Sequence, residues 1–207
     1  MLKELFIIRH GETELNKQGI VQGRGVNPPL NDAGKIQSEL FFNYYCEEPF
    51  EMIYTSSLRR THESVAKFIE KGIPWEQHAE LDEISWGIFE GKPATPEFKD
   101  EYRNLLVNWK KGRLNRKAPG GESPLDVSTR QKVFIQYLLS KPEEKILICM
   151  HGRAMRIFIP TLLNEDLRTM EEYPHHNLTL YKLIFDGRRF AISIFNNMNH
   201  LHLYGKN

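Results

Sequence analysis

Short, mostly apolar runs alternate along this chain with longer segments in which apolar residues recur every three or four positions. Residues 5–8, 50–54 and 145–150 are such runs, and they predict buried strands. The alternation of strands and helices predicts a mostly parallel central sheet covered by helices, an α/β fold with three α/β/α layers. The segments with helical periodicity are residues 31–44, 59–69, 126–139 and 152–163.

The predicted helix over 31–44 has both a start signal and a repeating apolar face. Asn31 is a residue type that caps helix N-termini. Ile36, Leu40 and Tyr44 recur at helical spacing after it. These three positions therefore predict the apolar face of this helix.

Two parts of the chain depart from the alternation. Residues 84–121 mix apolar, acidic and glycine residues, and Tyr102, Leu106 and Trp109 recur at helical intervals within them. We expect this segment to be a small, partly helical insertion that covers the site of a single domain spanning 1–207. The other part is a pair of strands expected at 177–185 and 189–195, joined by a hairpin at Asp186-Gly187.

One pattern occurs twice, because two predicted strands are each followed by histidine and glycine. His10 follows the first strand, directly after Arg9, and His151 follows the strand that ends at residue 150. The carboxyl ends of parallel strands meet at one edge of a sheet, so we expect these histidines to lie close together. The second strand leads to Arg59 and Arg60, which adds cations to the same edge.

Arginine and neutral histidine in this arrangement suit phosphoryl transfer. Guanidinium groups present planar donors to phosphate oxygens, and a neutral imidazole offers a nitrogen nucleophile. Positioned donors also stabilise the charge of a phosphate dianion through the transition state. Arg9-His10 alone is equally consistent with an exposed polar turn, so the prediction depends on the repeated pattern.

Composition limits what the chain binds. Its 207 residues suffice for one large core, and 28 Lys and Arg against 27 Asp and Glu give a net charge of +1. That balance provides no general attraction to nucleic acid or an anionic membrane, although it leaves room for a local cationic pocket. Cys46 and Cys149 lack metal-site spacing, and we expect Cys149 to be a buried thiol. No signal peptide or membrane span is visible in the sequence, so we expect a cytoplasmic protein.

A longer series of motifs runs through most of the chain. It begins with Arg9-His10-Gly11-Glu12-Thr13, Asn16, Gln22-Gly23 and Pro29-Leu30. It continues with Ser56-Ser57-Leu58-Arg59-Arg60, Leu81-Asp82-Glu83, Phe89-Glu90-Gly91, Gly120-Gly121-Glu122-Ser123 and His151-Gly152. In this order the series resembles the signature of the histidine phosphatase superfamily, which includes cofactor-dependent phosphoglycerate mutases. The resemblance implies a phosphoglycerate mutase-like fold.

The resemblance also implies a role for each matching residue. His10 is expected to be the nucleophile that becomes phosphohistidine, and Glu83 the general acid that later acts as the base for water. Arg9, Arg60 and His151 are expected to clamp the phosphoryl oxygens. Because these groups already offset the phosphate charge, no metal ion and no cofactor are expected. The residues expected to line the phosphate or substrate pocket are Asn16, Gln22, Gly23 and Gly152.

The resemblance leaves open where the phosphoryl group goes. The compact insertion resembles the small phosphatase branch, which includes α-ribazole phosphatase-like and broad-specificity enzymes. Our first expectation is therefore a phosphomonoesterase for a small phosphate ester. A phosphoglycerate mutase is the alternative, and a second phosphate site in the basic run at 110–113 would favour it, although a solvated face is the simpler interpretation. A catalytically silent protein that binds phosphorylated ligands is a third hypothesis, but the intact His10, Glu83 and His151 argue against it. A homodimer is also left open.

Several other polar residues receive weaker predictions. Arg59 is expected on the surface, because Arg60 falls at the family position. Asn177 is expected to lie near the site, whereas for His200 and His202 the sequence leaves a contribution to the pocket open. The histidines expected to be solvated or hydrogen-bonded without a catalytic role are His62, His78 and His176.

Overall fold

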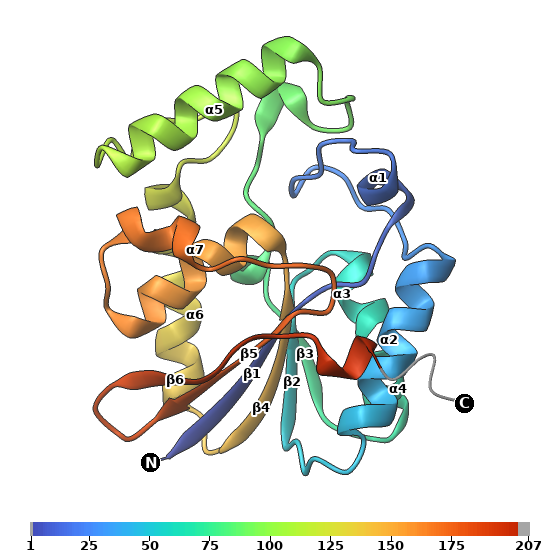
Figure 1. The fold of residues 1–207 in the computed structure, drawn as a ribbon. Helices are drawn as coiled ribbons and strands as arrows, with labels where there is room; N and C mark the ends of the chain where they lie inside the picture. The colour runs from blue at the N-terminus through green and yellow to red at the C-terminus, as the bar shows by residue number, and fades with distance from the viewer. Residues whose placement is uncertain (1, 203–207) are drawn as a thin grey trace.

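A computed structural model describes residues 2–202, and within this range the chain forms one six-stranded sheet (Figure 1). The strand order is β3-β2-β4-β1-β5-β6. Strands β3, β2, β4 and β1 pair in parallel, whereas β5 pairs antiparallel with both β1 and β6. The predicted mostly parallel sheet is confirmed. The strands are β1 (Lys3–Arg9), β2 (Met52–Thr55), β3 (Trp75–Gln77), β4 (Lys145–Met150), β5 (Leu180–Phe185) and β6 (Phe190–Asn197).

Helices cover both faces of the sheet, which confirms the three-layer α/β/α fold. Figure 1 shows α2, α3 and α4 on one face, α6 and α7 on the other, and α1 and α5 beyond the carboxyl ends of the strands. None of the helices within residues 2–202 has the length and apolar character needed to cross a membrane. The α-helices are α1 (Glu14–Lys17), α2 (Asp32–Tyr45), α3 (Arg59–Ser64), α4 (Ala66–Glu70), α5 (Pro96–Lys110), α6 (Pro124–Ser140) and α7 (Gly152–Leu163). Short 3₁₀ helices lie at Ala79–Leu81, Gly87–Phe89, Leu167–Glu172 and Asn199–Leu201.

The apolar run of β1 packs against both helical layers. Leu5 and Ile7 belong to the cluster formed with α6 and α7. Phe6 and Ile8 point the other way, into the cluster formed with α2 and α4. A central strand that is buried on both faces has a continuous apolar sequence, since successive side chains alternate between two dry layers. This burial fixes the strand whose carboxyl end carries Arg9 and His10.

The N-terminal cap of α2 matches the prediction, but its buried face differs. The Asn31 side chain accepts a main-chain N–H of the first turn at 2.8 Å. Phe41 and Tyr45 face the core, whereas Ile36 and Tyr44 are 46% and 48% exposed. The predicted face over 36, 40 and 44 is therefore wrong by one residue. Apolar residues occur on both sides of this helix, so spacing alone could not choose between them.

Three elements differ most from the prediction, by a later start, by an interruption or by their presence. β5 begins at Leu180 rather than 177, because Leu178 adopts a left-handed conformation with φ of 55° that a strand cannot contain. The helix expected over 59–69 is interrupted at Val65, where φ is −120°, and becomes α3 and α4. The edge strand β3 was not predicted, because a run of three residues is too short to show a period.

Residues 84–121 fold over the carboxyl edge of the sheet, with α5 as their main element (Figure 1). Trp86, Leu105 and Trp109 form a separate buried cluster, which Ile157 of α7 joins. The indole N–H of Trp109 also donates to a main-chain carbonyl seven residues further along at 2.8 Å. This small core holds α5 above α7 and leaves space beneath it at the strand ends.

Candidate active site

His10 lies at the carboxyl end of β1, and its contacts define the state of its ring. The ring is buried, and Nδ1 lies 2.7 Å from the carbonyl oxygen of Gly11. A carbonyl only accepts, so Nδ1 carries the proton and Nε2 keeps its lone pair. A Cβ on Gly11 would come within 2.7 Å of the Gly34 carbonyl oxygen, so this close turn requires glycine. His10 therefore presents Nε2 as a free nucleophile.

His151 follows β4 and meets His10 across the sheet. The two ring centroids are 5.1 Å apart. Nδ1 of His151 accepts a hydrogen bond from Nε of Arg60 at 3.2 Å, so the ring proton is on Nε2, which donates to the Ser56 hydroxyl at 2.7 Å. The structure thus brings together the histidines of the two repeated patterns.

Arg60 is fully buried at the start of α3, next to these histidines. Besides the bond to His151, its two terminal nitrogens donate to the carbonyls of Val26 at 2.9 Å and Gly23 at 3.3 Å. These bonds use three of its five N–H groups within the described chain, which leaves two for a ligand. Arg59, in contrast, is 61% exposed and pairs with Glu63 on the surface.

Arg9 completes the group of cations at this edge. One terminal nitrogen of Arg9 donates to Nδ1 of His175 at 3.3 Å. Its Nε is buried and has no hydrogen-bond partner among residues 2–202. His175 also packs against the start of α7, since a Cβ on Gly152 would lie 2.5 Å from its ring. Sequence reasoning did not single out His175, because neither a strand end nor a period marks it.

The three histidines of this edge are held neutral. Burial, and then the charges of Arg60 and Arg9, lower the pKa of His10 well below its ordinary value. Burial and then Arg60 do the same to the pKa of His151. Burial and then Arg9 lower the pKa of His175 to about 2. The nearby arginines therefore favour a neutral His10, although burial is the larger cause.

These lowered pKa values predict that the fold loses stability in mild acid. Below the ordinary histidine value of 6.5, the unfolded chain takes up protons that the folded chain refuses. The free energy of unfolding should therefore fall as pH drops through about 6.5, and thermal unfolding between pH 5 and 8 measures this. His175→Gln should flatten the slope, whereas replacing His202, which is exposed in the folded chain, should not. Equal slopes in the parent and His175→Gln would contradict a buried neutral ring.

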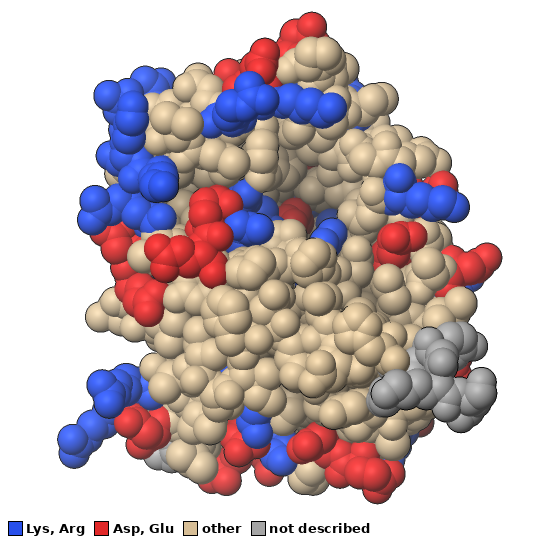
Figure 2. Space-filling view, in the orientation of Figure 1, with Lys and Arg blue, Asp and Glu red and all other residues tan. Residues whose placement is uncertain are grey.

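Glu83 is buried close to the same arginines. Its Oε1 accepts the main-chain N–H groups of Ile84 at 2.9 Å and Ala154 at 2.8 Å, and its Oε2 accepts that of Arg153 at 3.1 Å. Two of these donors belong to the first turn of α7, whose dipole favours a carboxylate there. Burial lowers the pKa of Arg60 to about 10, and the nearby charge of Glu83 partly opposes that shift. Figure 2 shows the surface hollowed beneath α5, with acidic and basic atoms at the base of the hollow.

The loop after β1 carries the expected pocket residues Asn16, Gln22 and Gly23, of which Gly23 contacts Arg60. Thr13 links two of them, because its hydroxyl lies 3.1 Å from Oδ1 of Asn16 and 3.0 Å from Oε1 of Gln22. Nε2 of Gln22 is buried without a partner in the described part of the chain. Gly23 receives the bond from Arg60 described above. The loop therefore adds an unused buried donor, Gln22 Nε2, to that of Arg9.

The remaining candidates separate into one that touches the site and others that do not. The Asn177 amide donates to the carbonyl oxygen of His10 at 2.9 Å, as expected for a residue near the site. His200 is buried among aromatic rings of α2 and bonds to the Leu178 carbonyl at 2.8 Å, and His202 is exposed. Among residues 2–202, no group of three or more His, Cys, Asp or Glu side chains is arranged to hold a metal ion.

An α/β domain with paired histidines and buried arginines at its sheet edge has the architecture of an enzyme that handles phosphoryl groups. Residues 5–198 match the family model of the histidine phosphatase superfamily, branch 1. Phosphoserine phosphatase 1 of Hydrogenobacter thermophilus is 26% identical over 200 residues, covering 96% of this chain and 94% of that one. "Probable phosphoglycerate mutase GpmB" of Yersinia enterocolitica is 30% identical over 166 residues, covering 77% and 74%. The crystal structure of the α-ribazole phosphatase from Shigella flexneri shares the fold, with a TM-score of 0.82 and 21% identity, covering 94% and 96%.

The chain therefore belongs to the histidine phosphatase superfamily. The predicted resemblance and the predicted class, an enzyme of the histidine phosphatase type, are confirmed.

Proposed function

We propose that this protein hydrolyses a small phosphate monoester through a phosphohistidine at His10. The observation that supports this most strongly is the free Nε2 of His10 beside unused donors of Arg9 and Arg60. Buried donors without a protein acceptor are costly, and a phosphoryl group supplies the missing acceptors. The experiment that tests the proposal is detection of phosphate bound to His10 during turnover, as described in the Discussion.

In the first step, Nε2 of His10 forms a bond to phosphorus while the bond to the leaving oxygen breaks. Arg9 and Arg60 hold the phosphoryl oxygens and stabilise their charge in the transition state, and the Nε2–H of His151 joins them when it exchanges the Ser56 hydroxyl for a phosphoryl oxygen. The negative charge of the bound ester favours a proton on Glu83, which gives that proton to the leaving oxygen, and the leaving group departs as an alcohol. The step ends with phosphohistidine and the carboxylate of Glu83.

In the second step, water attacks the phosphorus and the Glu83 carboxylate takes one of its protons. The bond between phosphorus and Nε2 breaks, which releases inorganic phosphate and restores neutral His10. Glu83 is protonated again at the end of this step. The same carboxyl group thus serves as acid and then as base, as microscopic reversibility requires.

The segment over the site favours hydrolysis over transfer to a second metabolite. Lys110, Lys111 and Arg113 are all exposed at the far end of α5, and Arg113 folds back onto Asn108 of that helix. They therefore fit a solvated surface better than a second phosphate site. The mutase remains the second candidate, because one relative at 30% identity is named as a phosphoglycerate mutase. The names of the relatives point to a small phosphorylated metabolite, such as a phosphorylated amino acid or sugar acid, as substrate.

Four broader features belong to the same proposal. The chain is proposed to act as one domain, with residues 84–121 as the cover of its site. A cytoplasmic location is supported by the free thiols of Cys46 and Cys149, and the near balance of charge argues against nucleic acid as partner. A homodimer is supported by the edge strand β6, where Phe195 is 52% exposed, and sedimentation velocity tests it.

Glu83→Gln should damage the enzyme in a way that depends on the leaving group. Alkyl phosphates need a proton on the leaving oxygen, so their kcat/KM should fall about 10²–10⁴-fold. Nitrophenyl phosphate, whose leaving group departs as an anion, should lose less than about 10-fold. Glu80→Gln is the matched control, because its side chain is partly exposed in the 3₁₀ helix just before Glu83. Equal losses on both esters would assign the acid to another group.

Activity should not depend on a metal ion, because arginines and histidines already offset the phosphate charge. We expect kcat/KM to be unchanged after incubation with EDTA and removal of the chelate. Vanadate, which mimics the phosphoryl group in its transition state, should inhibit competitively. A loss with EDTA that magnesium or zinc reverses would contradict the metal-free mechanism.

A further inference from the structure

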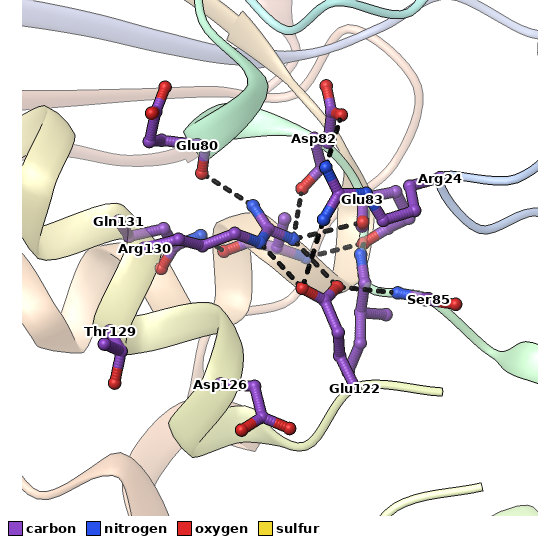
Figure 3. Close-up of polar contacts among 12 residues, drawn as sticks. Arg24, Glu80, Asp82, Glu83, Ser85, Glu122, Asp126, Thr129, Arg130 and Gln131 are labelled. Carbon is purple, nitrogen blue, oxygen red and sulfur yellow. Dashed lines mark hydrogen bonds and ion pairs between the residues drawn. The ribbon is translucent and has the colours of Figure 1, made fainter. Parts of the chain in front are cut away.

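Arg130 of α6 uses its guanidinium to hold the main chain that carries Glu83 (Figure 3). Nη1 donates to the carbonyl oxygen of Glu80 at 2.6 Å, and Nη2 donates to those of Asp82 at 2.9 Å and Glu83 at 3.1 Å. The side chain is only 15% exposed. An arginine that donates to three carbonyls of one short loop fixes the path of that loop.

Glu122 binds Arg130 and also holds the main chain on the other side of Glu83, at Ser85. Its carboxylate accepts Nε of Arg130 at 3.0 Å and Nη2 at 3.2 Å. It also accepts the main-chain N–H of Ser85 at 2.9 Å, and its own N–H donates to the Ser85 carbonyl at 2.8 Å. The chain is therefore held on both sides of Glu83 by the largely buried ion pair of Arg130 and Glu122, which Figure 3 shows beside Arg24, a second partner of Glu122.

The position of Glu83 needs such support. Residues 82–86 have no helix or strand of their own between the 3₁₀ turns at 79–81 and 87–89. The carboxylate is aimed by N–H groups of α7, but these act only if the main chain of Glu83 stays at the right distance. A shift of about 1 Å in a catalytic group can cost about 10²-fold in rate.

We propose that Arg130, paired with Glu122, is a positioning residue that sets Glu83 for proton transfer. This inference rests on the proposed function, in which Glu83 is the general acid. Arg130 itself touches the loop and Glu122 rather than the phosphoryl group. Its loss should therefore weaken the acid step and leave nucleophilic attack by His10 largely intact.

The test is a double-mutant cycle with two esters. Arg130→Met should lower kcat/KM for an alkyl phosphate by about 10- to 100-fold, and for nitrophenyl phosphate by only about 2- to 3-fold. In the Glu83→Gln background, Arg130→Met should cause no further loss on the alkyl phosphate, because the group it positions is gone. Arg130→Lys, which keeps the charge and a single donor group, should fall between the parent and Arg130→Met. Lys132→Met removes an exposed cation from the same helix and should change neither ester.

Other outcomes would contradict either the positioning role of Arg130 or the acid role of Glu83. Equal losses of Arg130→Met on both esters, or losses that add to those of Glu83→Gln, would show a merely structural role and overturn the inference. An unselective Glu83→Gln would instead overturn the acid assignment, and the positioning role with it. Formation of phosphohistidine from nitrophenyl phosphate shows that each variant folds. If Arg130→Met fails to fold, Glu122→Gln removes the charge of the same pair and must show the same ester selectivity.

Discussion

Replacing His10 with alanine is expected to abolish turnover, with kcat lower by at least about 10⁴-fold, as is usual when a catalytic nucleophile is removed. The ring is buried, its Nδ1–H is bound to the Gly11 carbonyl, and its Nε2 is the nucleophile of the proposed reaction. Arg9, Arg60 and His151 would still bind a phosphate ester in the variant. Binding and catalysis should therefore separate, with the affinity for inorganic phosphate retained within about 10-fold and turnover lost.

The control for this variant is His202→Ala, which removes an exposed histidine and should keep the activity of the parent. Steady-state hydrolysis of nitrophenyl phosphate measures the activity of both variants. Thermal unfolding shows whether each variant is folded. A His10→Ala protein that folds and retains more than about one-tenth of the parent activity would remove His10 from the mechanism.

Arg60→Met should have the second largest effect, lowering kcat/KM by about 10²–10³-fold on every ester. Its guanidinium joins His151 to the carbonyls of Gly23 and Val26, and its two remaining N–H groups face the phosphoryl oxygens in the proposed complex. Because the two carbonyls lose their donors, the free energy of unfolding should also fall by about 1–3 kcal/mol. The loss should not depend on the leaving group, which distinguishes it from the effect of Glu83→Gln.

Arg59→Met is the matched control, because it removes the neighbouring arginine, which is exposed and pairs with Glu63. It should change kcat/KM by less than about 2-fold, since a surface ion pair contributes little. Comparable losses in the two variants would show that general positive charge, rather than the placed donors of Arg60, supports the reaction.

The sequence predicted those parts of the fold that depend on local periodicity. The strands around Ile7 and Ile148 are buried on both faces, so their continuous apolar runs are unambiguous. The strand-end rule then brought His10 and His151 to one edge. The face of α2 was wrong because apolar residues lie on both of its sides, and only packing selects Phe41 and Tyr45.

The supporting contacts of the site could not be predicted in this way. His175 reaches Arg9 from a loop without a period, and Arg130 reaches the loop of Glu83 from a helix that shows only its apolar face in the sequence. Both contacts join residues far apart in the chain through side-chain length and main-chain carbonyls, and neither leaves a local signal. Motifs therefore identified the expected reacting groups, whereas the groups that hold them emerged only from the three-dimensional arrangement.

In the proposed reaction, a phosphoryl group moves from the substrate to His10 and then to water. The most direct test labels the protein with a ³²P-phosphate donor, removes the donor rapidly and follows the label on His10 with and without 3-phosphoglycerate. We expect label on His10 that leaves as inorganic phosphate at the rate of turnover in both cases, and no label in His10→Ala. A lasting label that passes to 3-phosphoglycerate, with interconversion of 2- and 3-phosphoglycerate, would contradict it and establish a mutase.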